Sequence, residues 1–133
     1  MKILIAIVLA FVIVDLIIVA YIVYRRLRKK IPKKVINKVR DSWKKIIRQS
    51  DHRHAIMDAD NLLDHTLTKL GLKGNLGTKL KKSPHLFSDI NSLWTAHKVR
   101  NNIAHQINYK IDERTYKKTM LAFKQAFKDL KIF

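Results

Sequence analysis

The fold of this chain is decided by residues 51–70, which read DHRHAIMDADNLLDHTLTKL. Apolar residues recur at intervals of three and four along this stretch, the spacing that places side chains on one face of an α-helix. Ser50 or Asp51 supplies a cap at the start, and Gly71 supplies a stop at the end. The stretch therefore predicts an amphipathic helix, whose buried stripe consists of Ala55, Ile56, Ala59, Leu62, Leu63, Leu67 and Leu70.

Three further segments show the same helical spacing, and no segment shows sustained strand alternation. The segments are residues 35–49, with an apolar face from Val35 to Ile47; residues 88–105, capped by Ser88; and a last helix capped by Asp112. All three glycines fall within residues 71–77, which predict a loop. The chain is thus predicted to be all-α, with residues 35–133 forming an up-and-down four-helix bundle.

The N-terminus carries 22 residues, Ile3 to Tyr24, that are apolar except for Asp15. Such a helix would rise about 33 Å, enough to cross a hydrocarbon core of roughly 30 Å. A secretory signal peptide is the alternative, but its positive charge would precede a shorter apolar stretch, whereas here the charge follows. Residues 1–24 are therefore predicted to be a transmembrane anchor. Asp15 is either a tolerated, protonated acid or a polar contact between the spans of a homo-oligomer.

Residues 25–34 form a basic connector directly after this span. Only Lys2 lies on the other side, so the positive-inside rule places the C-terminal domain in the cytoplasm, at the inner membrane. The connector side chains expected to contact anionic lipid headgroups are Arg25, Arg26, Arg28, Lys29, Lys30, Lys33 and Lys34.

Lys and Arg outnumber Asp and Glu by 28 to 10, and the excess has two origins. Residues 25–48 carry twelve basic residues and one acid, which suits a lipid surface, and residues 51–133 carry fifteen and eight, which suits nucleic acid. The absence of cysteine excludes disulfides, Cys-ligated metals and thiol catalysis. No His and carboxylate spacing matches a metal motif, and no Gly-Lys-Ser/Thr phosphate loop is present. Neither a metal nor a cofactor is expected.

The third predicted bundle helix ends in residues 94–105, WTAHKVRNNIAH. Its last six residues, RNNIAH at 100–105, resemble the signature of the HEPN superfamily, small helical domains of many prokaryotic ribonucleases and toxin systems. That signature is an Arg, usually followed by a polar residue, then three residues and a His at a helix end. The resemblance covers about residues 35–133, although only the hexapeptide is diagnostic.

The resemblance implies a metal-independent endoribonuclease, in a stress or defence role, with Arg100, Asn101 and His105 as catalytic residues. An arginine binds phosphate oxygens as charge builds up, and a histidine exchanges protons with the 2′-hydroxyl or the leaving oxygen. HEPN nucleases set two such helix ends against each other, which implies a homodimer through the third helix. The neighbouring side chains expected to contact RNA are His97, Lys98 and Asn102.

Helix geometry constrains this site. Arg100 and His105 are about 140° apart on a regular helix, so they converge only if the helix loosens or the arginine bends round. His97, Asn101 and His105 lie at intervals of four and share a face.

Other interpretations stay open. Arg100 can instead pair with Asp58, Asp60 or Asp64 on the helix at 51–70, which would make the motif structural. The domain can be a non-catalytic HEPN-like module that binds nucleic acid or a protein partner at the membrane. The whole chain can also be a structural membrane protein. HEPN toxins silenced by nucleotide transfer carry a Tyr where this chain has Ile107, so that regulation is not expected.

Overall fold

The computed structural model describes residues 1–27 and 30–133, and the side chains of residues 1–24 and 30–133. Within these residues the secondary structure consists of six α-helices and one 3₁₀-helix, without a strand. The predicted all-α class is therefore confirmed. The chain divides into two compact units, Met1–Lys30 and Ile31–Phe133.

The first unit is a single helix, α1 (Lys2–Leu27), which is long and apolar enough to cross a membrane. A signal sequence near an N-terminus meets the same criteria of length and composition. The side chains from Ile3 to Tyr24, including Asp15, are exposed rather than packed into a core. Of the predicted lipid contacts, Lys30 is exposed, whereas the following lie outside the described side chains: Arg25, Arg26, Arg28 and Lys29.

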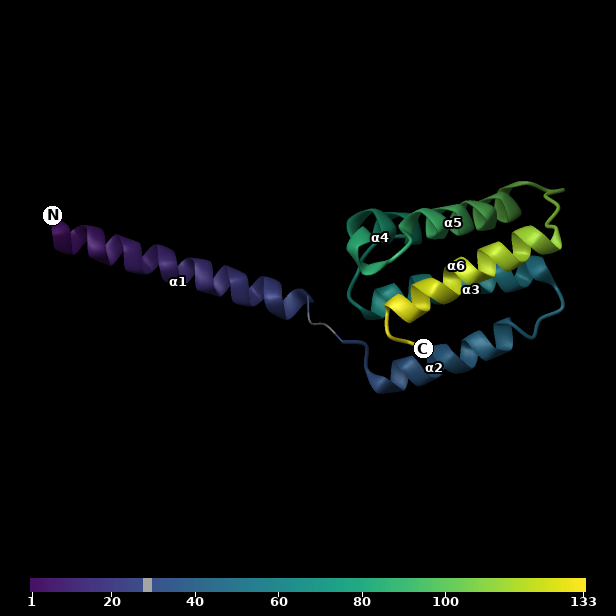
Figure 1. The fold of residues 1–133 in the computed structure, drawn as a ribbon, viewed down its shortest axis with the longest axis horizontal. Helices are drawn as coiled ribbons and strands as arrows, with labels where there is room; N and C mark the ends of the chain where they lie inside the picture. Colours follow the sequence, from purple (N-terminus) through teal and green to yellow (C-terminus); the bar gives the residue numbers. More distant parts are fainter. Residues whose placement is uncertain (28–29) are drawn as a thin grey trace. The chain divides into compact units, whose positions relative to one another are not determined.

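The second unit is built from four longer helices and one short one. They are α2 (Lys33–Ile46), α3 (His52–Lys69), α4 (Leu76–Lys82), α5 (Ile90–His105) and α6 (Glu113–Asp129), with a 3₁₀-helix at Pro84–Leu86. The chain direction alternates along α2, α3, α5 and α6, and α4 lies between α3 and α5 (Figure 1). Helix α3 is central, since it packs against α2, α4, α5 and α6.

The core follows the stripe predicted for α3. Ala55, Ile56, Ala59, Leu63 and Leu67 are fully buried, and they meet apolar side chains from every other helix of the unit. Burying a single Leu or Ile side chain contributes about 1.5–3 kcal/mol, so this face accounts for much of the bundle's stability. The predicted ends are also found: the Asp51 carboxylate accepts from the backbone N–H groups of Arg53 and His54, and Gly71 ends the helix at φ +90°.

Helix α2 differs from its prediction at its C-terminal end. It begins at Lys33, directly after Pro32, and the compact unit begins at the buried Ile31. Lys33 and Lys34, two of the predicted lipid contacts, are exposed residues of the first helical turn. The helix ends at Ile46, and Ile47 is 51 % exposed rather than packed into the core. Ile47 therefore does not belong to the buried face, although the sequence pattern placed it on the apolar face of this helix.

Two other predicted boundaries also shift. Gly77 is helical, because the Asn75 side chain caps α4 by accepting from the Thr78 N–H. Helix α5 is capped by Asp89 rather than Ser88, whose N–H and hydroxyl instead bind the carboxylate of Asp129 on α6. The predicted cap of α6, Asp112, is confirmed. Competing cap residues stand next to each other in these loops, and tertiary contacts decide between them.

Candidate functional site

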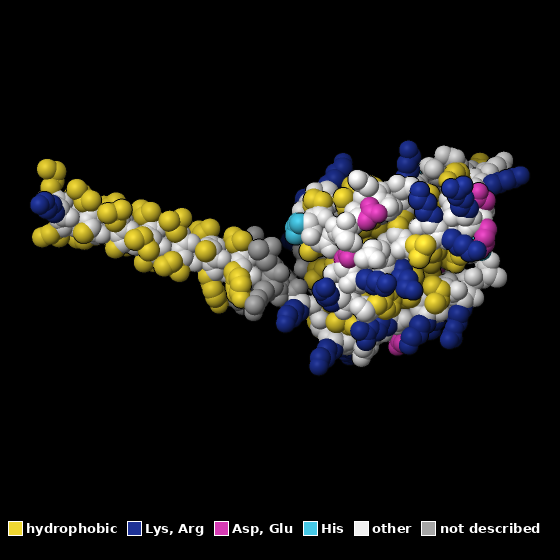
Figure 2. All heavy atoms as spheres, viewed as in Figure 1, with side chains coloured by type: hydrophobic (Ala, Val, Ile, Leu, Met, Phe, Trp, Pro, Cys, Tyr) yellow, Lys and Arg dark blue, Asp and Glu magenta, His cyan; other side chains and the backbone are white. Residues whose placement is uncertain are grey.

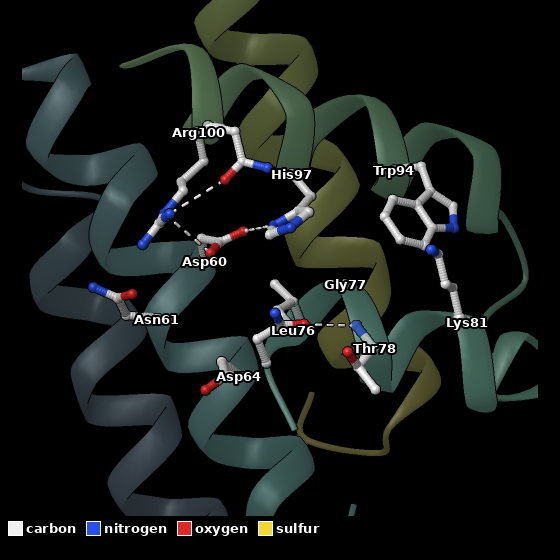
Figure 3. Close-up of a pocket in the computed structure, with 12 residues that line it drawn as sticks. Asp60, Asn61, Asp64, Leu76, Gly77, Thr78, Lys81, Trp94, His97 and Arg100 are labelled. Atoms are coloured by element: carbon white, nitrogen blue, oxygen red, sulfur yellow. Dashed lines mark hydrogen bonds and ion pairs between the residues drawn. The ribbon is translucent and has the colours of Figure 1, made fainter. Parts of the chain in front are cut away.

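An open pocket of about 470 Å³ lies between α3, α4 and α5. Figure 3 shows polar side chains from α3 and α5 on one side of it and α4 on the other. Its walls are Asp60, Asn61, Asp64, Asn75, Leu76, Gly77, Thr78, Lys81, Trp94, His97, Arg100 and Asn101.

The Asp60 carboxylate lies behind the pocket wall and contacts two residues of α5. It is only 3 % exposed; its Oδ1 is 2.7 Å from His97 Nδ1, and its Oδ2 is 3.3 Å from Arg100 Nε. A buried carboxylate is costly unless it is paired, and here a guanidinium and an imidazole pair with it. The sequence-based alternative that Arg100 pairs with an acid of this helix is thus confirmed, and the acid is Asp60.

The pairing fixes the chemistry that His97 presents to the pocket. A carboxylate oxygen only accepts, so Nδ1 carries the hydrogen and Nε2 of the neutral ring is left as an acceptor. The His97 side chain is 13 % exposed, and a Cβ placed on Gly77 would lie 3.6 Å from Nε2. Nε2 therefore faces the gap beside α4 rather than the core.

Arg100 is held by charge and by its neighbour on the helix. Its buried Nε has no hydrogen-bond partner, so the contact with Asp60 is an ion pair without hydrogen-bond geometry. Nη1 donates to Asn101 Oδ1 at 3.2 Å, and the side chain is 26 % exposed. The guanidinium is thus positioned at the pocket wall while part of it stays accessible to a ligand (Figure 3).

A buried lysine holds α4 in place as the opposite wall. Lys79 Nζ donates to the Asp64 carboxylate at 2.7 Å, to the Asp64 carbonyl at 3.0 Å and to Thr68 Oγ1 at 2.6 Å. Leu76 and Leu80 are buried on the same short helix. Because Lys79 neutralises Asp64, the positive charges of Arg100 and the exposed Lys81 are not cancelled by that acid.

The predicted site residues are only partly brought together. His97, Arg100 and Asn101 line the pocket, whereas His105 is exposed at the end of α5 and does not line it. Helix α5 stays regular to His105, and Gln106 N still donates to Asn102 O at 2.9 Å, so the loosening that would turn His105 toward Arg100 is absent. The other predicted RNA contacts lie apart from the pocket: Lys98 is exposed, and half-buried Asn102 accepts from Gln106.

Several wall residues carried no functional prediction, namely Asn61, Asn75, Gly77, Lys81 and Trp94. Among the pocket residues outside the RNNIAH motif and its neighbours, the sequence marks only Asp60 as unusual. It lies four residues after Ile56 and three before Leu63, so an acid falls on the buried apolar stripe.

The other histidines of α3 have local partners. His52 stacks on Tyr116 at 3.8 Å between ring centroids, and His54 Nδ1 is 2.7 Å from the Asp51 carboxylate. In the part of the chain that the structure describes, no group of three or more His, Asp or Glu side chains is placed to hold a metal ion.

The second unit as a whole is basic. Residues 31–133 carry 22 Lys and Arg against 9 Asp and Glu. In Figure 2, Lys and Arg side chains are spread over the visible face of this unit, with fewer acids among them. Such a surface attracts polyanions at long range. Comparison of the chain with protein-family models, with curated proteins and with solved structures finds no match.

Proposed function

We propose that the chain is a membrane-anchored, HEPN-like endoribonuclease that cleaves single-stranded RNA without a metal. The observation that carries the proposal is the buried Asp60 carboxylate, which positions both the His97 imidazole and the Arg100 guanidinium at the wall of one open pocket. The alternating course of α2, α3, α5 and α6 supports a four-helix bundle of the HEPN type. The fit of residues 100–105 to that family's signature supports it independently.

The reaction uses the 2′-hydroxyl of RNA as an internal nucleophile. His97 Nε2 takes the hydroxyl proton, O2′ bonds to phosphorus, and the bond from phosphorus to O5′ breaks. Arg100 binds the phosphate oxygens as their charge rises, and Asn101 holds the guanidinium in place. The departing O5′ takes a proton, which leaves a 2′,3′-cyclic phosphate and a 5′-hydroxyl.

His105 fits this scheme as the donor of that last proton, supplied by a second copy of the chain. It lies exposed at the end of α5, outside the pocket of its own protomer. Two α5 ends that meet in a homodimer would bring each His105 toward the partner's Arg100, and each copy would complete the other's site.

The membrane part of the proposal rests on α1 and on the charge beside it. Helix α1 has the length and composition of a span, and residues 25–34 carry seven Lys and Arg. Anionic headgroups attract such a segment, and the positive-inside rule places residues 31–133 in the cytoplasm, at the inner membrane.

The test is cleavage of fluorescent single-stranded RNA by the full chain in liposomes, with the cyclic phosphate product identified by mass. Arg100→Ala and His105→Ala are expected to abolish cleavage, and a chelator is expected to leave it unchanged. The matched controls are Arg114→Ala and His85→Ala, because both side chains are exposed and lie outside the pocket. Full cleavage by either Arg100→Ala or His105→Ala would refute the assignment.

Mixing the two inactive variants tests the shared site. A mixed dimer retains one Arg100 and one His105 that face each other, so partial activity returns if the two groups come from different protomers. If the mixture stays inactive, His105 does not act across a dimer.

One observation favours a second candidate, a module that binds nucleic acid without cleaving it. Lys and Arg outnumber Asp and Glu by 22 to 9 in residues 31–133, which suits contacts with phosphates and needs no catalytic group. That candidate predicts RNA affinity that falls steeply with salt and no product at any RNA concentration.

A further inference from the structure

The pocket contains an aromatic wall that the proposed chemistry does not use. Half-buried Trp94 lines it next to His97, with ring centroids 5.9 Å apart and planes at 69°. Lys81 rises from α4 at the same end of the pocket as Trp94, whereas Arg100 lies toward the other end (Figure 3). An indole at one end and a guanidinium at the other match the two parts of a nucleotide, its base and its phosphate.

Gly77 keeps the space between these groups open. A Cβ at this position would come within 3.6 Å of both Trp94 Cη2 and His97 Nε2. Those distances are ordinary van der Waals contacts, so a methyl group fits without strain, yet it occupies the gap that a flat ring would enter. Gly77 lies in the regular helix α4, so no unusual backbone angle requires a glycine there.

The electrostatics of the pocket favour an anion despite its two carboxylates. Asp60 is paired with His97 and Arg100, and Asp64 is paired with the buried Lys79. The ammonium of Lys81 is exposed and has no ion-pair partner among the described residues. A phosphate group therefore meets a net positive wall.

We propose that this pocket is the subsite for one ribonucleotide of the RNA substrate. Its base stacks on Trp94 beside Gly77, its scissile phosphate lies at Arg100, and the adjacent phosphate contacts Lys81. The volume of about 470 Å³ is within the usual range for a site that holds one small ligand. The amides of Asn61 and Asn101 also line the pocket and can donate to and accept from the edge of a base. The identity of the ligand as RNA rests on the function proposed above.

Binding is measured apart from cleavage with 2′-O-methyl hexanucleotides, which lack the internal nucleophile. Trp43 is 5 % exposed in the core, so quenching of tryptophan fluorescence in the full chain reports on Trp94. The hexanucleotide is expected to quench it. Trp94→Leu lacks this reporter, so its affinity is measured by fluorescence anisotropy of a dye-labelled hexanucleotide, and binding is expected to weaken about 5- to 150-fold, the range found for loss of one base stack.

Two further variants test the space beside Gly77 and the charge of Lys81 separately. Gly77→Ala removes no charge and suits a helix, so it is expected to weaken binding several-fold while the unfolding temperature stays the same or rises. Lys81→Ala is expected to weaken binding and lower its salt dependence by about one ion, whereas Lys82→Ala, an exposed neighbour outside the pocket, leaves both unchanged.

The outcomes separate this proposal from the catalytic one. Binding that depends on Trp94 and Gly77 without cleavage of natural RNA upholds the subsite and refutes the nuclease. Cleavage that proceeds equally in Trp94→Leu and Gly77→Ala, with unchanged affinity, overturns the subsite alone. Adenosine monophosphate that binds as tightly as the hexanucleotide would show that the pocket serves a free nucleotide, which also overturns the proposal.

Discussion

Replacing Asp60 with alanine tests the group on which the whole site depends. The variant removes the 2.7 Å contact with His97 Nδ1 and the 3.3 Å ion pair with Arg100 Nε. Both partners keep their positions on α5, but each loses its acidic partner. Losing both contacts is expected to destabilise the bundle.

The loss of unfolding free energy in Asp60→Ala follows from the two contacts that Asp60 makes. A hydrogen bond to a charged group is worth about 1.5–3 kcal/mol. The ion pair adds about 0.5–1 kcal/mol, because Arg100 is 26 % exposed and water partly replaces the lost partner. Removing Asp60 also relieves the cost of burying its carboxylate, which offsets part of this sum. We therefore expect a loss of about 2–3 kcal/mol, which lowers the unfolding temperature of a domain this size by roughly 10–20 °C.

The assay is thermal unfolding of the full chain in detergent micelles, followed by tryptophan fluorescence. Both tryptophans, Trp43 and Trp94, lie in the second unit, so α1 does not contribute to the signal. Asp58→Ala is the matched control, because Asp58 lies on the same helix but is exposed and only accepts a surface hydrogen bond from Gln49. That control is expected to shift stability by less than about 0.5 kcal/mol. If Asp60→Ala unfolds within about 2 °C of Asp58→Ala, the reasoning about the buried network is wrong.

Three further predictions concern the surrounding scaffold. Lys79→Met is expected to lower the free energy of unfolding, measured with denaturant, by about 1.5–3 kcal/mol, because three hydrogen bonds donated by a buried ammonium are lost; an unchanged midpoint would contradict this. Arg53→Ala removes the hydrogen bonds to the carbonyls of Tyr109 and Ile103, so amides of the α5–α6 loop should exchange faster with deuterium, while equal rates would rule out this tether. Hydrogen bonds from Ser92 and Thr115 lower the pKa of the cap residues Asp89 and Asp112. Since the pKa of each carboxyl is lower in the folded than in the unfolded chain, the ionised caps stabilise the fold at neutral pH, and this contribution is lost as the pH falls below about 4. The double variant Asp89→Asn, Asp112→Asn should therefore show a smaller acid-induced drop in unfolding temperature than the wild type.

The sequence predicted the helices best where their own residues determine them. The stripe from Ala55 to Leu67, with Asp51 before it and Gly71 after it, marks α3 without help from the rest of the chain. Predictions failed where two local solutions compete, as at Ser88 and Asp89, which can both cap α5. The choice depends on Asp129, forty-one residues away, which binds Ser88 and leaves Asp89 to cap the helix.

The site was likewise predicted where local spacing determines it and missed where contacts between helices do. His97 and Asn101, four residues apart, share a helix face as expected, and both line the pocket. Which acid would meet Arg100 was left open, because Asp60 and Asp64 lie four residues apart and share a helix face. Only the packing of α3 on α5 and α4 assigns Asp60 to Arg100 and Asp64 to Lys79. The walls from α4 were not foreseen, since the position of a seven-residue helix depends on the buried Lys79 rather than on its own pattern.

Burying the Asp60 carboxylate carries a desolvation cost that packing of the bundle does not require. Position 60 lies on the apolar stripe of α3, and a leucine there would continue the core without the cost of burying a carboxylate. Packing alone therefore does not require an acid at this point. What Asp60 adds is orientation, since it fixes the protonated nitrogen of His97, leaves Nε2 toward the gap and holds Arg100 at the wall of the same pocket. A carboxylate that carries a desolvation cost and holds two side chains at an open pocket favours a role in binding what enters that pocket over a role in packing alone.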